Sequence, residues 1–135
     1  MKKFKLTKND LPTDEYLDSL WQQCVKARAK NRSELSGSPE SPRCGHHIYH
    51  KPNLRLRWAL EFGICLTNRE HARYHEFEKR AFPSDRKIAD DMRERFLKIR
   101  GMTEEIAMIL KRQTGGIDRF AVKIYLLQKL KEFSV

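Results

Sequence analysis

The sequence predicts a mostly helical α+β fold with one short β-hairpin at its centre. Apolar residues recur at three- to four-residue intervals over most of the chain, which is the period of an amphipathic helix. Two β-prone apolar runs interrupt that period, HHIYH at positions 46–50 and FGICL at positions 62–66. Capping residues, glycines and prolines mark the ends of the helical segments. A hairpin flanked by helices is therefore the expected arrangement.

The first helix is predicted over positions 13–30, where Thr13 stands at the N-cap and acidic residues fill the first turn. Its apolar face consists of Leu17, Leu20, Trp21, Cys24 and Val25. Positions 31–42 are rich in serine, glycine, proline and glutamate, which predicts a loop. A basic connection, KPNLRLRW at positions 51–58, separates the two strands.

Helices are predicted for the rest of the chain. Thr67 or Asn68 stands at the N-cap of a helix over 69–82, and further helices are expected over 84–100, 103–114 and 118–133. Their apolar stripes are interpreted as packing faces, with Trp21, Trp58 and Phe82 as core anchors. At 135 residues, the chain is expected to form a single domain over 1–135, with a core at 13–82 and a C-terminal helical extension at 84–135.

An excess of basic residues predicts a polyanionic partner. Lysine and arginine number 28 against 18 acidic residues, so the formal net charge is +10. The basic and acidic counts are nine and six in positions 1–45, seven and four in 46–82, and 12 and eight in 83–135. Because the excess is spread along the chain, it belongs to the folded body, and DNA is the favoured partner. The alternative is a basic surface that serves solubility alone.

Three cysteines without a C-x-x-C spacing are a poor basis for disulfides, and Cys24 and Cys65 fall in apolar patterns as expected for small core residues. The apolar stretches are far shorter than the ~20 residues that span a membrane, so no membrane segment is expected. The N-terminal sequence MKKFKLTKND lacks an apolar signal region, which favours a cytoplasmic protein.

Four of the five histidines form two pairs whose spacing suits a metal site. His46 and His47 are adjacent, so on a strand their side chains point to opposite faces, and one can bind a metal while the other does not. His71 and His75 are four residues apart on a predicted helix, which places both imidazoles on one face. If the hairpin folds against that helix, His46 completes a three-histidine site with open coordination positions. The alternative is a pair of solvated surface histidines.

In these segments the chain resembles the HNH (His-Asn-His, or ββα-metal) endonucleases, in particular small phage-borne members. The resemblance covers about positions 17–82 and is carried by HHI at 46–48, NLRLRW at 53–58, LEFGICL at 60–66 and H-x-x-x-H at 71–75. It implies a ββα-metal core and a metal-dependent DNA endonuclease that hydrolyses phosphodiester bonds with one divalent ion, Mg²⁺, Mn²⁺, Ni²⁺ or Zn²⁺. It also implies a role in processing phage or mobile-element DNA.

Carried over by position, the resemblance implies that His46, His71 and His75 are metal ligands and that His47 is the general base. A histidine has an ordinary pKa near ~6.5, so its neutral ring can take a proton from water near neutral pH. The metal would neutralise the charge that grows on the phosphate and on the leaving oxygen.

DNA phosphates are expected to be contacted by Lys51, Arg55, Arg57 and Arg73. Arg55 and Arg57 lie in the basic connection and are placed to clamp neighbouring phosphates. They can equally be charges that keep the edge of the hairpin from aggregating.

The chain departs from the family pattern at the middle asparagine. That position, nine residues before the first helical histidine, is Phe62. In the family this amide braces the loop that bears the base, so Asn53 or Asn68 would have to supply the brace, or catalysis would be weakened. A DNA-binding relative that has lost catalysis and acts as an accessory or structural module is therefore the alternative function.

Many family members also carry two C-x-x-C pairs that bind a structural zinc. Here Ser33 and Ser36 stand at one pair and Thr67 and Glu70 at the other. Hydroxyl groups are poor zinc ligands, so no zinc knuckle is expected, and packing by the C-terminal helices must stabilise the hairpin. One further alternative is a closed structural zinc site formed by Cys44, His46, His50 and Cys65.

Overall fold

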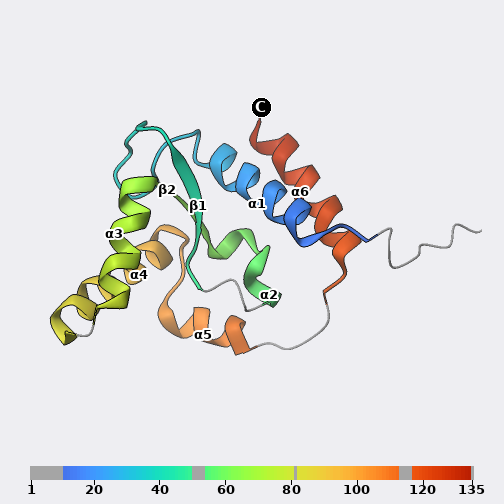
Figure 1. Cartoon of the computed structure of the whole chain (residues 1–135). Coiled ribbons are helices and arrows are strands. Elements are labelled where there is room, and N and C mark those ends of the chain that lie inside the picture. Colours follow the sequence, from blue (N-terminus) through green and yellow to red (C-terminus); the bar gives the residue numbers. More distant parts are fainter. Residues whose placement is uncertain (1–10, 50–53, 81, 113–116, 135) are drawn as a thin grey trace, which may run out of the picture.

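A computed structural model describes residues 11–49, 54–80, 82–112 and 117–134 of the chain. The elements, in chain order, are α1 (Asp14–Arg28), β1 (Arg43–His47), α2 (Leu54–Arg57), β2 (Gly63–Thr67), α3 (Asn68–Lys79), α4 (Pro83–Ile99), α5 (Glu104–Arg112) and α6 (Arg119–Phe133). A 3-10 turn, Leu60–Phe62, precedes β2. The described part is mostly helical with one two-stranded antiparallel sheet, which confirms the predicted α+β, mostly α class (Figure 1).

Helices cover both faces of the small sheet. The strands pair antiparallel, with His46 opposite Ile64 and His47 opposite Gly63, and alternate residues point to opposite faces. Ile64 packs with residues of α3 and α4 in one buried cluster, while Cys65 packs with residues of α1 in a second. Figure 1 shows α1 and α6 side by side on one side of the hairpin, and α3 and α4 on the other. The hairpin therefore divides the core into two halves.

Helix α1 packs closely against the hairpin. It begins after Thr13, whose hydroxyl accepts a hydrogen bond from the backbone three residues later, as predicted. A Cβ atom at Gly63 would lie 2.5 Å from the Trp21 ring, so only glycine allows this approach. The Gln22 amide makes hydrogen bonds of 2.7 and 2.8 Å to the backbone N–H and carbonyl of Gly45. This side chain therefore satisfies the backbone at the free edge of β1.

Helix α3 begins at a capping box formed by Thr67 and Glu70, which confirms Thr67 as its cap. The Glu70 carboxylate accepts hydrogen bonds from the Thr67 backbone N–H at 2.9 Å and from the Ser33 hydroxyl at 2.5 Å. The Ser33 hydroxyl in turn accepts from the backbone N–H groups of Leu35 and Ser36, both at 3.1 Å. Burial opposes ionisation of Glu70, but hydrogen bonds from Ser33, Ser36 and Thr67 outweigh it and hold the pKa of this carboxyl below its usual value.

Replacing Glu70 by alanine is expected to lower the free energy of unfolding by about 2–4 kcal/mol, because buried donors lose a charged acceptor. Since the folded pKa is depressed, the stabilisation is present above the ordinary glutamate pKa and is lost as the pH falls through the lower folded value. Urea unfolding at pH 7 measures the loss. The control is Glu94→Ala at an exposed site of α4, where a change within about 0.5 kcal/mol is expected. Equal losses of unfolding free energy in Glu70→Ala and Glu94→Ala would contradict the stabilising role of the Glu70 carboxylate.

The C-terminal helices pack against the hairpin, as predicted, and they do so on both of its sides. Phe96 of α4 and Ala107 of α5 are buried in the cluster that contains Ile64, and Leu126 of α6 is buried in the cluster that contains Trp21. Helix α4 ends before Gly101, which has a φ of 72°. The Thr103 hydroxyl caps α5 and the Asp118 carboxylate caps α6.

Three local expectations are corrected. The first strand spans residues 43–47 and not 46–50, because the residues before Gly63 wind into the 3-10 turn and strand pairing ends there. The basic connection contains the one-turn helix α2. Both tryptophans are buried, but Phe82 is 70% exposed, because it occupies the N-cap of α4 and not its apolar face.

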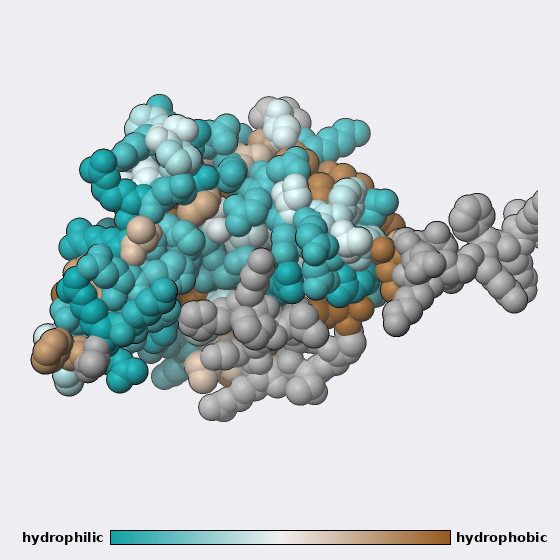
Figure 2. All heavy atoms as spheres, viewed as in Figure 1, coloured by the Kyte–Doolittle hydropathy of each residue, from teal (hydrophilic) through white to brown (hydrophobic). Residues whose placement is uncertain are grey.

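Among the helices in the described ranges, none combines the length and apolarity needed to cross a bilayer. Figure 2, in the same view as Figure 1, shows a mostly hydrophilic surface, with hydrophobic side chains gathered over α6. Ile124 and Leu127 of that helix are 66% and 42% exposed. The apolar surface of this face is therefore concentrated on the side of α1 and α6.

Candidate metal centre

Three histidines come together on the α3 side of the hairpin. One ring nitrogen each of His46, His71 and His75 lies within 4.8 Å of the other two. The Nε2 atoms of His71 and His75 are 2.9 Å apart. The His46 ring stands edge-on to both, with its centroid 5.0 Å from that of His71 and 5.4 Å from that of His75. These three residues are called the histidine cluster below.

Strand and helix geometry explain this convergence. His71 and His75 are separated by about one turn of α3, so both imidazoles project from the same face of the helix. Strand β2 ends at Thr67 and α3 begins at Asn68, so no loop separates the hairpin from the helix. The helix therefore lies against the face of the sheet on which His46 stands, as the sequence predicted.

The cluster is buried at one end and accessible at the other. The rings of Tyr74 and Phe96 stand 4.9 and 5.5 Å from that of His46, which is only 2% exposed. His71 and His75 are half-buried. Burial, and secondly the neighbouring His75, lower the pKa of His71, so this imidazole stays neutral near pH 7. Neutral imidazole is the form that binds a cation.

The cluster fits a divalent cation. Nitrogens that bind one ion at 2.0–2.1 Å stand roughly 3–3.5 Å apart in neighbouring coordination positions. The Nε2 atoms of His71 and His75 are 2.9 Å apart, and one nitrogen of each of the three rings lies within 4.8 Å of the other two. Three nitrogen donors favour Zn²⁺ or Ni²⁺ over Mg²⁺, which prefers oxygen ligands. Of the ions that the sequence suggests, these two suit the residues best.

Glu78 stands beside the cluster, with its Oε1 atom 3.5 Å from Nδ1 of His75. The opposite nitrogen of that ring, Nε2, faces His71. A carboxylate next to the second nitrogen of a metal-binding histidine fixes its tautomer and makes it a stronger ligand. The side chain therefore occupies the position from which it can orient His75 toward a cation.

Replacing Glu78 by glutamine is expected to weaken binding of Zn²⁺ or Ni²⁺ by about 10- to 100-fold, which is the usual cost of losing such an orienting group. Isothermal titration calorimetry of the metal-free protein measures the affinity. Glu76→Gln is the matched control, because Glu76 lies on the same helix but is 61% exposed and pairs with Arg80. The two variants binding the metal equally well would contradict an orienting role for Glu78.

His47 lies on the opposite side of the hairpin, against α1. Its ring stacks on that of Trp21, with centroids 4.0 Å apart and planes inclined by 5°. Its Nε2 atom lies 2.9 Å from the backbone carbonyl oxygen of Arg57. A carbonyl only accepts hydrogen bonds, so Nε2 carries the proton and Nδ1 is the basic nitrogen of the neutral ring. The structure thus separates His47 from the cluster and fixes both its orientation and its tautomer.

Phe62, at the position where the resemblance leads us to expect an asparagine, cannot brace a loop by hydrogen bonding. It is buried in the core, 3% exposed. The Arg57 carbonyl and the indole of α1 hold His47 in its place. Of the two asparagines expected as substitutes, Asn68 is the exposed first residue of α3, and Asn53 lies outside the described residues.

The residues expected to contact DNA have different surroundings. The Arg57 guanidinium makes hydrogen bonds of 3.0 and 2.7 Å to Asp18 and so ties α2 to α1. Arg73 is exposed on α3. The backbone of Arg55 lies in α2, whereas its side chain and the whole of Lys51 fall outside the described part of the chain. Phosphate binding by these four residues stays a prediction.

The alternative zinc site is not supported by the strand register. Cys65 packs against α1, on the face of the sheet opposite to the one on which His46 meets α3. Cys44 and Cys65 are both free, and His50 lies outside the described residues. Cys24 and Cys65 are buried, which confirms them as small core residues.

Sequence reasoning missed two parts of the site. Glu78 follows His75 by three residues on a helix, and this spacing is a signal that could have placed it beside the cluster. The contact of Trp21 with His47 joins residues from distant segments through the docking of α1, and no local pattern reveals it.

No family model matches this chain, and no curated protein or solved structure does either. The residues and their geometry therefore carry the functional inference.

Proposed function

We propose that this protein is a metal-dependent DNA endonuclease of the HNH type. The observation that carries the proposal is the convergence of His46 with His71 and His75, because the resemblance assigns these three positions to one metal ion. Strands β1 and β2 with helix α3 then correspond to the ββα-metal unit. The net charge of +10 suits a polyanionic substrate.

A second geometric agreement supports the same relationship. Ser33, Ser36, Thr67 and Glu70 stand where many relatives carry the four cysteines of a zinc knuckle. Here they form one hydrogen-bonded group around the Glu70 carboxylate. Positions that share a metal ion in those relatives thus share a carboxylate in this chain. The pair Ser33 and Ser36 thus meets the pair Thr67 and Glu70, as the resemblance implies, although none of the four residues is a cysteine.

His47 is suited to act as the general base. Its Nδ1 atom is the basic nitrogen, and the ring is oriented by the Arg57 carbonyl and by Trp21. His46 and His47 extend to opposite faces at the end of β1 from Cα atoms about 3.8 Å apart. A phosphate lying across that end would meet the base on one side and the histidine cluster on the other. In-line displacement needs this opposition, because the nucleophile and the leaving oxygen stand on opposite sides of phosphorus.

A divalent cation bound by the cluster would supply Lewis-acid stabilisation of the phosphate and of the leaving oxygen. The protein residues provide the rest of the chemistry. His71 remains neutral for binding, Glu78 orients His75, and the core around His46 fixes its ring. His47 takes the proton of the attacking water.

The rival function is a DNA-binding relative without catalysis, and Phe62 favours it. Loss of the family's asparagine removes one brace of the base, which the contacts of His47 with the Arg57 carbonyl and Trp21 would have to replace. The rival predicts DNA binding that weakens with salt but no strand scission. Both functions need the same basic surface, so binding alone does not separate them.

Incubating supercoiled plasmid with the protein and Zn²⁺, Ni²⁺, Mn²⁺ or Mg²⁺ tests the proposal. The expected result is nicked or linear DNA with at least one of the ions and intact plasmid with a chelator. Intact plasmid with all four ions, together with salt-sensitive binding, would establish the rival function instead.

A further inference from the structure

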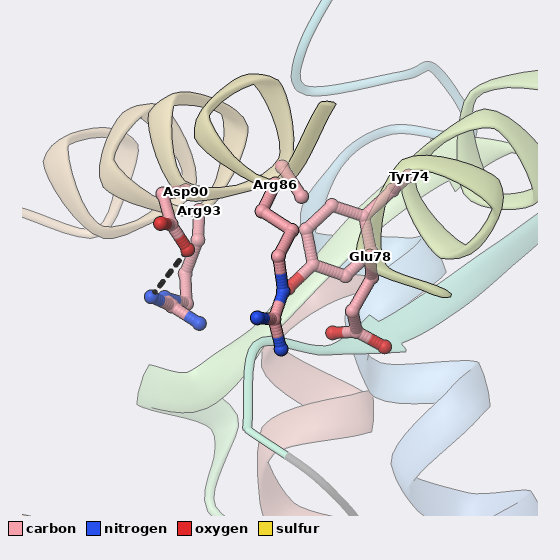
Figure 3. Close-up of a pocket in the computed structure, with 6 residues that line it drawn as sticks. Tyr74, Glu78, Arg86, Asp90 and Arg93 are labelled. Atoms are coloured by element: carbon pink, nitrogen blue, oxygen red, sulfur yellow. Dashed lines mark hydrogen bonds and ion pairs between the residues drawn. The ribbon is translucent and has the colours of Figure 1, made fainter. Parts of the chain in front are cut away.

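A cleft of about 470 Å³ opens between α3 and α4 (Figure 3). It is lined by Tyr74, Glu78, Arg86, Ala89, Asp90 and Arg93. Tyr74 forms the wall that the cleft and the cluster share. Its ring contacts those of His46 and His75, at centroid distances of 4.9 and 5.5 Å. A group bound in the cleft would therefore be separated from the cluster by the thickness of one side chain.

The charges in the cleft are unevenly paired. Glu78 faces His75, with 3.5 Å between its Oε1 and the histidine Nδ1, and Asp90 accepts a 3.0 Å hydrogen bond from Arg93. Both carboxylates are thus engaged. Arg86 is exposed, and its guanidinium makes no ion pair or hydrogen bond with any residue that the structure describes. Figure 3 shows this side chain extending from α4 into the cleft.

We propose that this cleft binds a backbone phosphate of the DNA strand, next to the phosphate that lies at the histidine cluster, and that Arg86 is its principal contact. The inference rests on the proposed nuclease function and adds a substrate subsite to it. A guanidinium is the side chain best suited to a phosphate, because it presents paired N–H donors to two oxygens. Arg93, which donates a 3.0 Å hydrogen bond to Asp90, would be a second cation lining the subsite.

The test compares Arg86→Ala with Arg95→Ala. Arg95 is an exposed arginine of the same helix that does not line the cleft. It follows Arg86 by nine positions, about half a revolution around the helix axis at 3.6 residues per turn. Both variants lose one positive charge at an exposed site, so neither is expected to affect folding, and thermal unfolding checks this. Affinity for a short DNA duplex is measured by fluorescence anisotropy with a chelator present, from 50 to 200 mM NaCl.

We expect Arg86→Ala to weaken binding by about tenfold at 50 mM NaCl, as for loss of one charge-assisted contact. The salt slope should fall by about one unit, so the difference from the wild type shrinks by about 3.5-fold at 200 mM. Arg95→Ala should lose less affinity and keep the wild-type slope. Equal losses in the two variants, or no loss in Arg86→Ala, would overturn the subsite while leaving the nuclease proposal intact. A wild-type protein that neither binds nor nicks DNA would overturn both.

Discussion

Replacing His47 by alanine is expected to lower the rate of DNA cleavage by a factor of about 10²–10⁴, the usual contribution of a positioned general base. The structure gives the reason, because the Arg57 carbonyl fixes the proton on Nε2 and leaves Nδ1 as the basic nitrogen. The histidine cluster lies on the other side of the hairpin, so metal binding should be unchanged. Single-turnover cleavage of a labelled duplex with saturating metal measures the rate.

Loss of the imidazole also removes a ring stacked on Trp21, so reduced stability must be separated from reduced chemistry. Unfolding curves of both proteins set an assay temperature at which each is folded. Metal affinity and DNA affinity, measured at that temperature, are the controls. Cleavage by His47→Ala at the wild-type rate would show that another group takes the proton.

Replacing His75 by alanine is expected to have a different signature, with metal affinity lost as well as cleavage reduced to background. His75 supplies one nitrogen of the cluster and is the contact of Glu78, so the variant loses a ligand together with the carboxylate that orients it. A ligand at 100 times its Kd stabilises the folded state by about 2.7 kcal/mol. Zn²⁺ or Ni²⁺ at such a concentration should therefore raise the melting temperature of the wild type and leave that of His75→Ala unchanged.

The half-buried position of His75 makes this variant a better probe than His46→Ala, because His46 is enclosed by the core. Together, His47→Ala and His75→Ala separate the two parts of the site. His47→Ala should keep its metal affinity and lose most of its cleavage rate, whereas His75→Ala should lose both. Equal metal stabilisation of the wild type and His75→Ala would contradict the assignment of the cluster.

Much of this site could be predicted because its spacing is local. The separation of His71 from His75 is a property of one helix, and the opposite orientation of His46 and His47 is a property of one strand. Thr67 with Glu70 is likewise a capping pattern that reads directly from the sequence. In each case the backbone geometry of a single element decides where the side chains point.

The remaining features depend on how elements dock, which no local pattern encodes. Trp21 meets His47 only because glycine in β2 lets α1 approach the hairpin. The ion pair of Arg57 with Asp18 likewise joins α2 to α1, and the basic connection in which Arg57 lies gave no local sign of it. Phe82 was expected in the core, yet a position just before a helix has no defined face. Such contacts follow from tertiary packing, so local sequence patterns could not predict them.

The account depends most directly on the three imidazoles sharing one ion. Crystals of the wild-type protein soaked in Zn²⁺ or Ni²⁺ and measured at the absorption edge of the metal would locate that ion by its anomalous scattering. The account predicts one peak, about 2.0–2.1 Å from a nitrogen of each of His46, His71 and His75. A fully occupied metal site elsewhere on the chain, with no peak among these rings, would contradict it.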